Sequence, residues 1–318
     1  MFVLSFLGRR VLAAALTLLV TSFLVFVLLE VAPGSPELVL LGTRQPTPEL
    51  VHAIRAQNHL DDPFFTRYWH WLSGAVRLDF GRSVRSGRSV GDILAERLDV
   101  TAFLGLYAFV LVMVIAVPAG LFAAIRRNTA WDRGVTLVAL LGVSAPPFAV
   151  GLLLLTVFGV ALGWFPVFGA GTGFADRISH LTLPAVALAV AEVAIVVRQT
   201  RAAALDVTTK DFVTFARARG LPRRLVLGRY ALRNSALPVV TSAGLVLAFS
   251  LTGAVLVEAT FSLPGLGSLL VESVTTKDIP VVQGLALLAA ALMVGVNLLV
   301  DLCYLGLDPR IRHAGGVG

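Results

Sequence analysis

Long apolar runs alternate with polar segments along the whole chain. A bilayer core about 30 Å thick requires roughly 20 apolar residues in a helix. Five uncharged runs come close to or exceed this length, and a sixth, shorter run from Leu183 to Val197 is interrupted by Glu192. Unpaired backbone amides are excluded from lipid, and the runs show little alternation of polar residues, so helices are predicted in place of a β-barrel. The sequence therefore predicts an all-α integral membrane protein with six transmembrane helices. The five uncharged runs are Val11–Leu29, Ala102–Ile125, Val135–Leu162, Val239–Val257 and Val281–Val300.

The first run resembles a secretory signal peptide, because Arg9 and Arg10 precede it. It is longer than the usual apolar region of about 7 to 15 residues, and the VAPGSP that follows offers no small-residue cleavage site. We therefore predict a retained membrane helix within residues 1–31.

Residues 32–100 form a polar segment long enough for a small folded region. Thr47-Pro48-Glu49 and Asp62-Pro63 each indicate the start of a helix. The second helix, FFTRYWHWLSGAV, is rich in aromatic residues, and two interpretations stay open: it lies in the membrane interface, or it packs on the core of its own segment. A turn is predicted around Ser86-Gly87, and the helix VGDILAERLDVTAF should lead from it into the second span.

Composition narrows the class of protein. Hydrophobic residues make up 57% of the chain and charged residues 14%, which leaves too little polar surface for a water-soluble enzyme of this size. A single cysteine, Cys303, excludes an internal disulfide and a cysteine metal cluster. No GxxxxGK, HExxH, CxxC or GxSxG motif occurs, and all five histidines fall outside the predicted spans. We expect no enzyme activity, metal site or cofactor in this chain.

The net charge of +7 is unevenly distributed between the segments that connect the spans. Residues 1–10, 126–133, 198–237 and 304–318 together carry +12, whereas the segments on the opposite side sum to −1. Basic loops remain in the cytoplasm, so both termini are predicted to be cytoplasmic. The basic excess therefore reports membrane topology, and no nucleic-acid partner is expected.

Charged groups and prolines within the spans are candidates for a translocation path. Glu192 could face a polar path and attract a cationic group; alternatively, it pairs with Arg198 or reaches the membrane boundary. Pro146-Pro147 should bend the third span, which suits a wall that moves or lines a cavity but also occurs in static bundles. The carboxylates at span ends are interpreted as structural: Glu30, Glu258 and Asp301.

The loop at residues 198–237 is the most specific feature of the chain. Helices are predicted at Asp206–Arg219 and Leu225–Asn234, separated by Gly220-Leu221-Pro222. Phe212, Phe215 and Arg219 have the spacing of one helix face, which is suited to insertion in a groove on another protein. The alternative is an ordinary basic cytoplasmic loop.

This loop resembles the EAA loop of the membrane subunits of binding-protein-dependent ABC importers, in the form found in dipeptide, oligopeptide and nickel permeases. Thr214, Phe215, Ala216 and Gly220 occupy the marked positions, and only Ala216 and Gly220 match the general pattern. FARARGL resembles the TARAKGL of the peptide permeases, and ALRNSALP resembles their ALRNALLP. The first span with its Pro-Gly-x-Pro, the Asp-x-Gly-x-Ser element and the terminal Leu-Asp-Pro-Arg resemble the same family, so the likeness covers almost the whole chain.

The resemblance implies a type I ABC importer (MetI-like) permease fold in a bacterial cytoplasmic membrane. Residues 101–303 would form its core, with the loop at 198–237 inside it and a cytoplasmic tail at 304–318. The implied partners are a second homologous permease, two ABC ATPase subunits that bind ATP and Mg²⁺, an extracytoplasmic substrate-binding protein and the lipid bilayer. The residues expected to couple to the ATPases are Phe212, Thr214, Phe215, Ala216, Arg217, Arg219, Gly220 and Leu221.

Substrate identity is less constrained than the class of transporter. Di- and oligopeptides are the first expectation, and nickel, glutathione or another small solute are alternatives within the same family. A proton-coupled secondary transporter would also have six spans and Glu192, and a non-transporting scaffold would share the composition; neither would need the loop signature.

Overall fold

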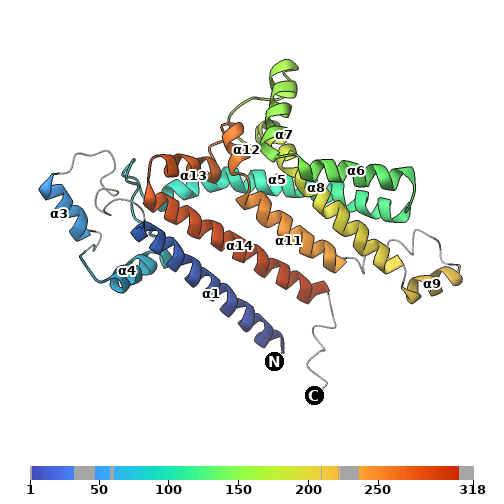
Figure 1. The fold of residues 1–318 in the computed structure, drawn as a ribbon, viewed down its shortest axis with the longest axis horizontal. Helices are drawn as coiled ribbons and strands as arrows, with labels where there is room; N and C mark the ends of the chain where they lie inside the picture. Colours follow the sequence, from blue (N-terminus) through green and yellow to red (C-terminus); the bar gives the residue numbers. More distant parts are fainter. Residues whose placement is uncertain are drawn as a thin grey trace. The chain divides into compact units, whose positions relative to one another are not determined.

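The computed structural model describes residues 2–31, 47–57, 61–208, 210–220, 222 and 236–307. Within these ranges the protein is helical, and the only strand-like feature is one isolated bridge between Arg82 and Ser89. The predicted all-α class is confirmed. The helices are α1 (Phe2–Val31), α3 (Pro48–Gln57), α4 (Phe64–Val76), α5 (Val90–Ile125), α6 (Ala130–Ser144), α7 (Pro147–Leu154), the π-helix η1 (Leu155–Ala161), α8 (Phe174–Thr208), α9 (Asp211–Ala218), α11 (Ala236–Thr252), α12 (Val255–Thr260), α13 (Leu266–Thr275) and α14 (Ile279–Leu307) (Figure 1).

Five helical segments in the described ranges are long and apolar enough to cross a membrane, and a bent pair makes a sixth candidate. The helix predicted to lead into the second span is confirmed, because α5 is continuous from Val90 to Ile125. The fourth span is longer than the apolar run alone indicates, since α8 begins at Phe174 and continues to Thr208.

The predicted bend at Pro146-Pro147 is confirmed. The segments Ala130–Ser144 and Pro147–Ala161 meet at 99°. A residue that precedes proline avoids the helical region, and both Ala145 (ψ 118°) and Pro146 (ψ 130°) are accordingly extended. Pro147 then occupies the first turn of α7, where its missing N–H leaves no helical hydrogen bond unmade.

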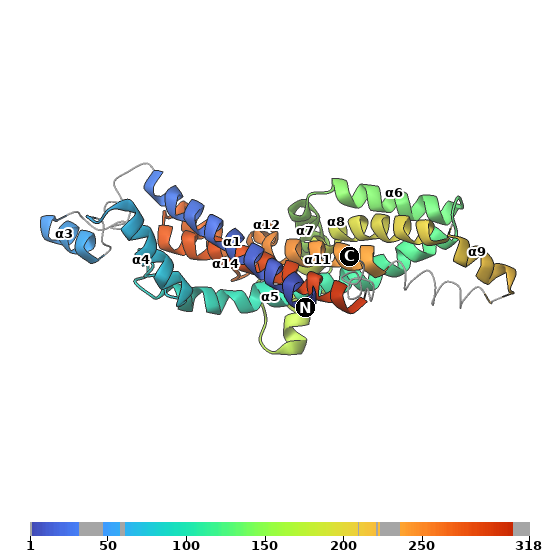
Figure 2. The ribbon, with the colours of Figure 1, turned by 90° about the horizontal axis from the view of Figure 1, so that it is seen from below.

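The chain divides into two compact units. The first comprises Met1–Leu4, Ala102–Leu263 and Val296–Gly318. Its centre is α8, which contacts α6, α7 and α11, with α6 and α11 alongside it (Figures 1 and 2). Burial of apolar side chains is the main stabilising contribution to such packing. The buried cluster of this unit contains Val112, Ala116, Ala189, Val196, Val197 and Val246.

The second unit comprises Ser5–Thr101 and Pro264–Gly295, and in it α4 packs on α1. Tyr68 stacks edge-on against Phe23 and Phe26, and its hydroxyl forms a 2.8 Å hydrogen bond with Ser22 Oγ. One aromatic face of α4 therefore packs on α1, which lies outside residues 32–100, so these contacts are not the packing within its own segment that was one of the two interpretations. The opposite face leaves Phe65 and Trp69 74% and 66% exposed, in the manner of rings at a membrane interface.

The second unit also contains the predicted turn at Ser86-Gly87. The Asp278 carboxylate accepts hydrogen bonds from Ser83 Oγ at 2.5 Å and from the N–H groups of Val84 and Arg85 at 3.2 and 3.4 Å. Ser83 Oγ in turn accepts the N–H of Ser86 at 3.0 Å. A buried carboxylate therefore organises the turn. It adjoins a core of Val90, Leu94, Leu266, Leu269, Val281 and Leu285.

Candidate functional site

The candidate coupling helix, α9, follows directly after α8 (Figure 2). The single helix predicted from Asp206 to Arg219 is wrong at its start, because α8 ends at Thr208 and α9 begins at Asp211. Lys210 forms the joint: its N–H donates to the Val207 carbonyl at 3.2 Å and its ammonium pairs with Asp206 at 3.1 Å. β-Branched residues before the joint and an acid at the start of α9 favour this division. The second predicted helix, Leu225–Asn234, lies outside the described residues.

The two faces of α9 differ in exposure. Val213 is fully buried, whereas Thr214 and Arg219 are exposed and Phe215 is 70% exposed. An exposed phenylalanine beside an arginine is a typical anchor for a protein partner. The side chains of Phe212, Ala216 and Arg217, and the whole of Leu221, lie outside the described part of the chain.

Gly220 ends the coupling segment in the conformation expected of a glycine after a helix. Its φ is +74°, in the left-handed region that side chains with a Cβ occupy at a cost of about 1–2 kcal/mol. The Arg219 N–H still donates to the Phe215 carbonyl at 3.0 Å. The chain therefore leaves α9 in a direction that depends on glycine at this position.

An ion pair between Asp132 of α6 and Arg201 of α8 was not predicted from the sequence. The guanidinium of Arg201 binds both carboxylate oxygens, with Nε to Oδ1 at 2.6 Å and Nη2 to Oδ2 at 2.8 Å. Oδ2 also accepts the N–H of Asn128 at 3.0 Å, and Asp132 is only 4% exposed. The pair fixes the start of α6 to the part of α8 that precedes α9. Its one sequence signal was a single acid in an arginine-rich connection.

The two arms of the third span and α8 provide the candidate path residues. Glu192 is buried and accepts a 2.7 Å hydrogen bond from Ser250 Oγ of α11, whereas Arg198, one of its candidate partners, is exposed. Pro146 and Pro147 instead form the α6–α7 bend. The structure therefore places Glu192 at a contact between α8 and α11, whereas the prolines lie at the bend between α6 and α7.

Two carboxylates predicted at the edges of spans are buried. Glu258 has no exposed surface and Asp301 is 8% exposed. Glu258 lies near the end of the candidate span Leu237–Thr260, as predicted, and its neighbours Val257, Phe261 and Leu263 are buried with it.

Removal of the Ser250 hydroxyl is expected to destabilise the protein. In Ser250→Ala the buried Glu192 carboxylate loses a donor, and an unsatisfied buried polar group costs about 1–3 kcal/mol. Glu192→Gln keeps an acceptor for Ser250 and should be nearly neutral. Unfolding in detergent micelles measures both, with Ser144→Ala as a control because that hydroxyl is exposed and donates within its own helix. A neutral Ser250→Ala would contradict the assigned hydrogen bond.

Comparison with known proteins now identifies the family. Residues 116–313 match the family described as binding-protein-dependent transport system inner membrane component, and residues 3–105 match the corresponding N-terminal family. The chain belongs to this family of permeases. It is a multi-pass inner membrane protein and the permease subunit of an ABC importer, a class that works with ATPases and a substrate-binding protein.

Relatives of the permease match it over nearly its full length. The glutathione transport system permease protein GsiC of Escherichia coli (strain K12) is 38% identical over 310 residues, which is 98% of this chain and 99% of the relative. GsiC of Shigella boydii serotype 4 gives the same values. Among solved structures, an inward-facing MetNI methionine ABC transporter has a TM-score of 0.56 at 16% identity, over 68% of this permease and 96% of that chain. That likeness confirms the fold.

Proposed function

We propose that the permease imports short peptides, with glutathione and other small peptides as the first substrates to test. The observation that carries the proposal is the match to GsiC at 38% identity over 98% of the chain. The permease would form the translocation path with a second homologous permease. Two cytoplasmic ATPase subunits would bind ATP and Mg²⁺, and an extracytoplasmic binding protein would deliver the peptide.

The proposal assigns α9 as the helix that docks in a groove on an ATPase subunit. Its support is the exposed Phe215 beside Arg219, the left-handed Gly220 that ends the segment, and the Lys210 joint to α8. ATP-driven closure of the ATPases would move α9. Because α8 is tied to α6 by Arg201 and Asp132, that movement would be transmitted to the bent span and alternate access to the path.

The proposal assigns Glu192, Pro146 and Pro147 to the path. A peptide carries a terminal ammonium group, and a carboxylate at membrane depth is the group that would attract it. The bend at Pro146-Pro147 would give the α6–α7 wall its change of direction. Both termini would lie in the cytoplasm, in agreement with the distribution of basic residues.

Uptake by the reconstituted transporter tests the proposal. Proteoliposomes would contain this permease with its partner permease and ATPases, with the binding protein outside and labelled glutathione as substrate. We expect ATP-dependent uptake that excess unlabelled di- or tripeptide reduces at least several-fold and that a nickel chelate leaves unchanged. Competition by the nickel chelate alone would overturn the peptide assignment. Loss of uptake on adding a protonophore at constant ATP would indicate a proton-coupled transporter.

A further inference from the structure

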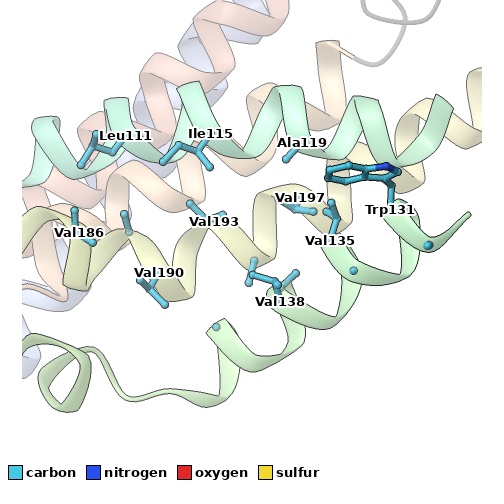
Figure 3. Close-up of a pocket in the computed structure, with 16 residues that line it drawn as sticks. Leu111, Ile115, Ala119, Trp131, Val135, Val138, Val186, Val190, Val193 and Val197 are labelled. Carbon is cyan, nitrogen blue, oxygen red and sulfur yellow. The ribbon is translucent and has the colours of Figure 1, made fainter. Parts of the chain in front are cut away.

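A large apolar groove lies between α5, α6 and α8. Its volume is about 720 Å³, and all 16 lining residues are apolar, glycine or tryptophan. Figure 3 shows Leu111 and Val186 at one end and Trp131 near Ala119 and Val197 at the other. From Val186 to Val197 the groove follows roughly 16 Å of α8, at 1.5 Å per residue. It is therefore an elongated apolar groove along membrane helices.

The lining excludes a peptide as the natural occupant. A peptide brings amide groups and charged ends, and burial of such groups without hydrogen-bond partners is strongly unfavourable. The groove offers only the indole N–H of Trp131 as a polar group. An aliphatic chain has no polar groups that need hydrogen-bond partners, so it suits this lining. The groove is therefore distinct from the proposed peptide path at Glu192.

The end of the groove at Trp131 is aromatic and basic. Trp131 is 61% exposed and stacks edge-on against Phe122 at 6.2 Å, and the Arg126 guanidinium lies 4.5 Å from the centre of the Phe122 ring. Arg127 and Arg133 are exposed in the same connection. Tryptophan and arginine at the end of a span are the residues that meet lipid headgroups.

The local acid offsets the charge of these arginines only in part. Asp132 is the one acidic residue among residues 126–133, and its carboxylate is held by Arg201. The connection therefore keeps a net positive charge, and Arg126 lies near the Trp131 end of the groove through Phe122. This combination complements a phosphodiester headgroup joined to an acyl chain.

We propose that the groove between α5, α6 and α8 binds one acyl chain of an anionic phospholipid, with the headgroup phosphate held by Arg126, Arg127 and Arg133. The apolar lining suits an acyl chain, and the positive charge near its Trp131 end complements an anionic headgroup; an apolar helix of the partner permease is the alternative occupant that the test distinguishes. The site is independent of which solute the transporter carries.

Photo-crosslinking in the assembled transporter tests the site. The transporter would be placed in phosphatidylcholine nanodiscs with a trace of phosphatidylglycerol that carries a diazirine on its acyl chain. We expect cross-links on groove residues of α5, α6 and α8. Unlabelled phosphatidylglycerol should compete at least fivefold better than phosphatidylcholine, and inorganic phosphate should not compete. Equal competition by the two lipids would overturn the proposal, as would groove cross-links that form in the isolated chain and vanish in the assembled transporter.

Groove-filling and charge variants give a second test. A Cβ at Gly134, which lines the groove, would meet no atom within 4 Å, so Gly134→Leu fills the groove without a backbone clash and should abolish the cross-links. Gly295→Leu is the matched control, because that helical glycine is equally open. Each arginine-to-glutamine change at 126, 127 or 133 should weaken phosphatidylglycerol competition about fivefold, whereas Arg9→Gln should not. Unchanged cross-linking in a well-folded Gly134→Leu variant would refute the site.

Discussion

Gly220→Val is expected to abolish uptake while the permease still inserts in the membrane. Gly220 has a φ of +74°, and valine would force the chain out of this conformation because its β-branched side chain is disfavoured there. The segment after residue 220 would then leave α9 in a different direction, and α9 would no longer be held in the orientation needed to dock. Uptake in proteoliposomes and co-purification of the ATPase subunits measure the effect.

Two variants separate this geometric cause from a general loss of stability. Gly220→Asn should retain much of the uptake, since asparagine tolerates the left-handed region. Gly87→Val introduces a similar strain in the second unit, where φ is +68° and the added Cβ meets no neighbour, and it should leave ATPase co-purification intact. Normal uptake by Gly220→Val at normal expression would refute the assignment of α9 as the coupling helix.

Arg201→Gln should destabilise the permease by about 3 kcal/mol, the cost of leaving one member of a buried ion pair without its partner. Asp132 would keep only the N–H of Asn128 as a donor. Asp132→Asn should also destabilise the permease. The double variant should lower the free energy of unfolding by at least about 1 kcal/mol less than the sum of the two single effects. Chemical unfolding in detergent micelles gives the three values.

Arg198→Gln is the matched control for this cycle, because Arg198 is exposed on the same helix. It should change stability by less than about 0.5 kcal/mol. We also expect the Arg201 variant to lower the uptake obtained per ATP hydrolysed, since α6 would no longer follow α8. Strict additivity of the two single variants would show that the Asp132–Arg201 contact has no energetic role.

The spans could be predicted because lipid imposes a simple rule on sequence. Uncharged runs such as Ala102–Ile125 must be helical, and Pro146-Pro147 must interrupt a helix through its missing amides and the restriction on Ala145. The division between α8 and α9 could not be predicted in the same way. Residues Asp206 to Asp211 contain neither glycine nor proline, and the contacts that Lys210 makes with Val207 and Asp206 are local ones that a continuous helix also allows.

The candidate site was predictable only where its residues are close in sequence. The spacing of Phe212, Phe215 and Arg219 predicted a helix with a docking face, with an ordinary basic loop as the alternative, and the structure has a helix there, α9. Asp132 and Arg201 are 69 residues apart, and nothing local in either segment specifies the other. Nearby Arg198 was one candidate partner of Glu192, whereas the donor that the structure shows, Ser250, comes from a different helix and could not be predicted for the same reason.

The Asp278 carboxylate has a consequence for how the protein is made. It closes the Ser83–Ser86 turn from a position 195 residues later in the chain. During synthesis, Ser83 and the amides beside it are therefore complete long before their acceptor leaves the ribosome. The turn reaches its final form only after α13 has been made and Asp278 has been delivered beside it. The Ser83–Ser86 turn therefore cannot mature until the segment that contains Asp278 has been synthesised.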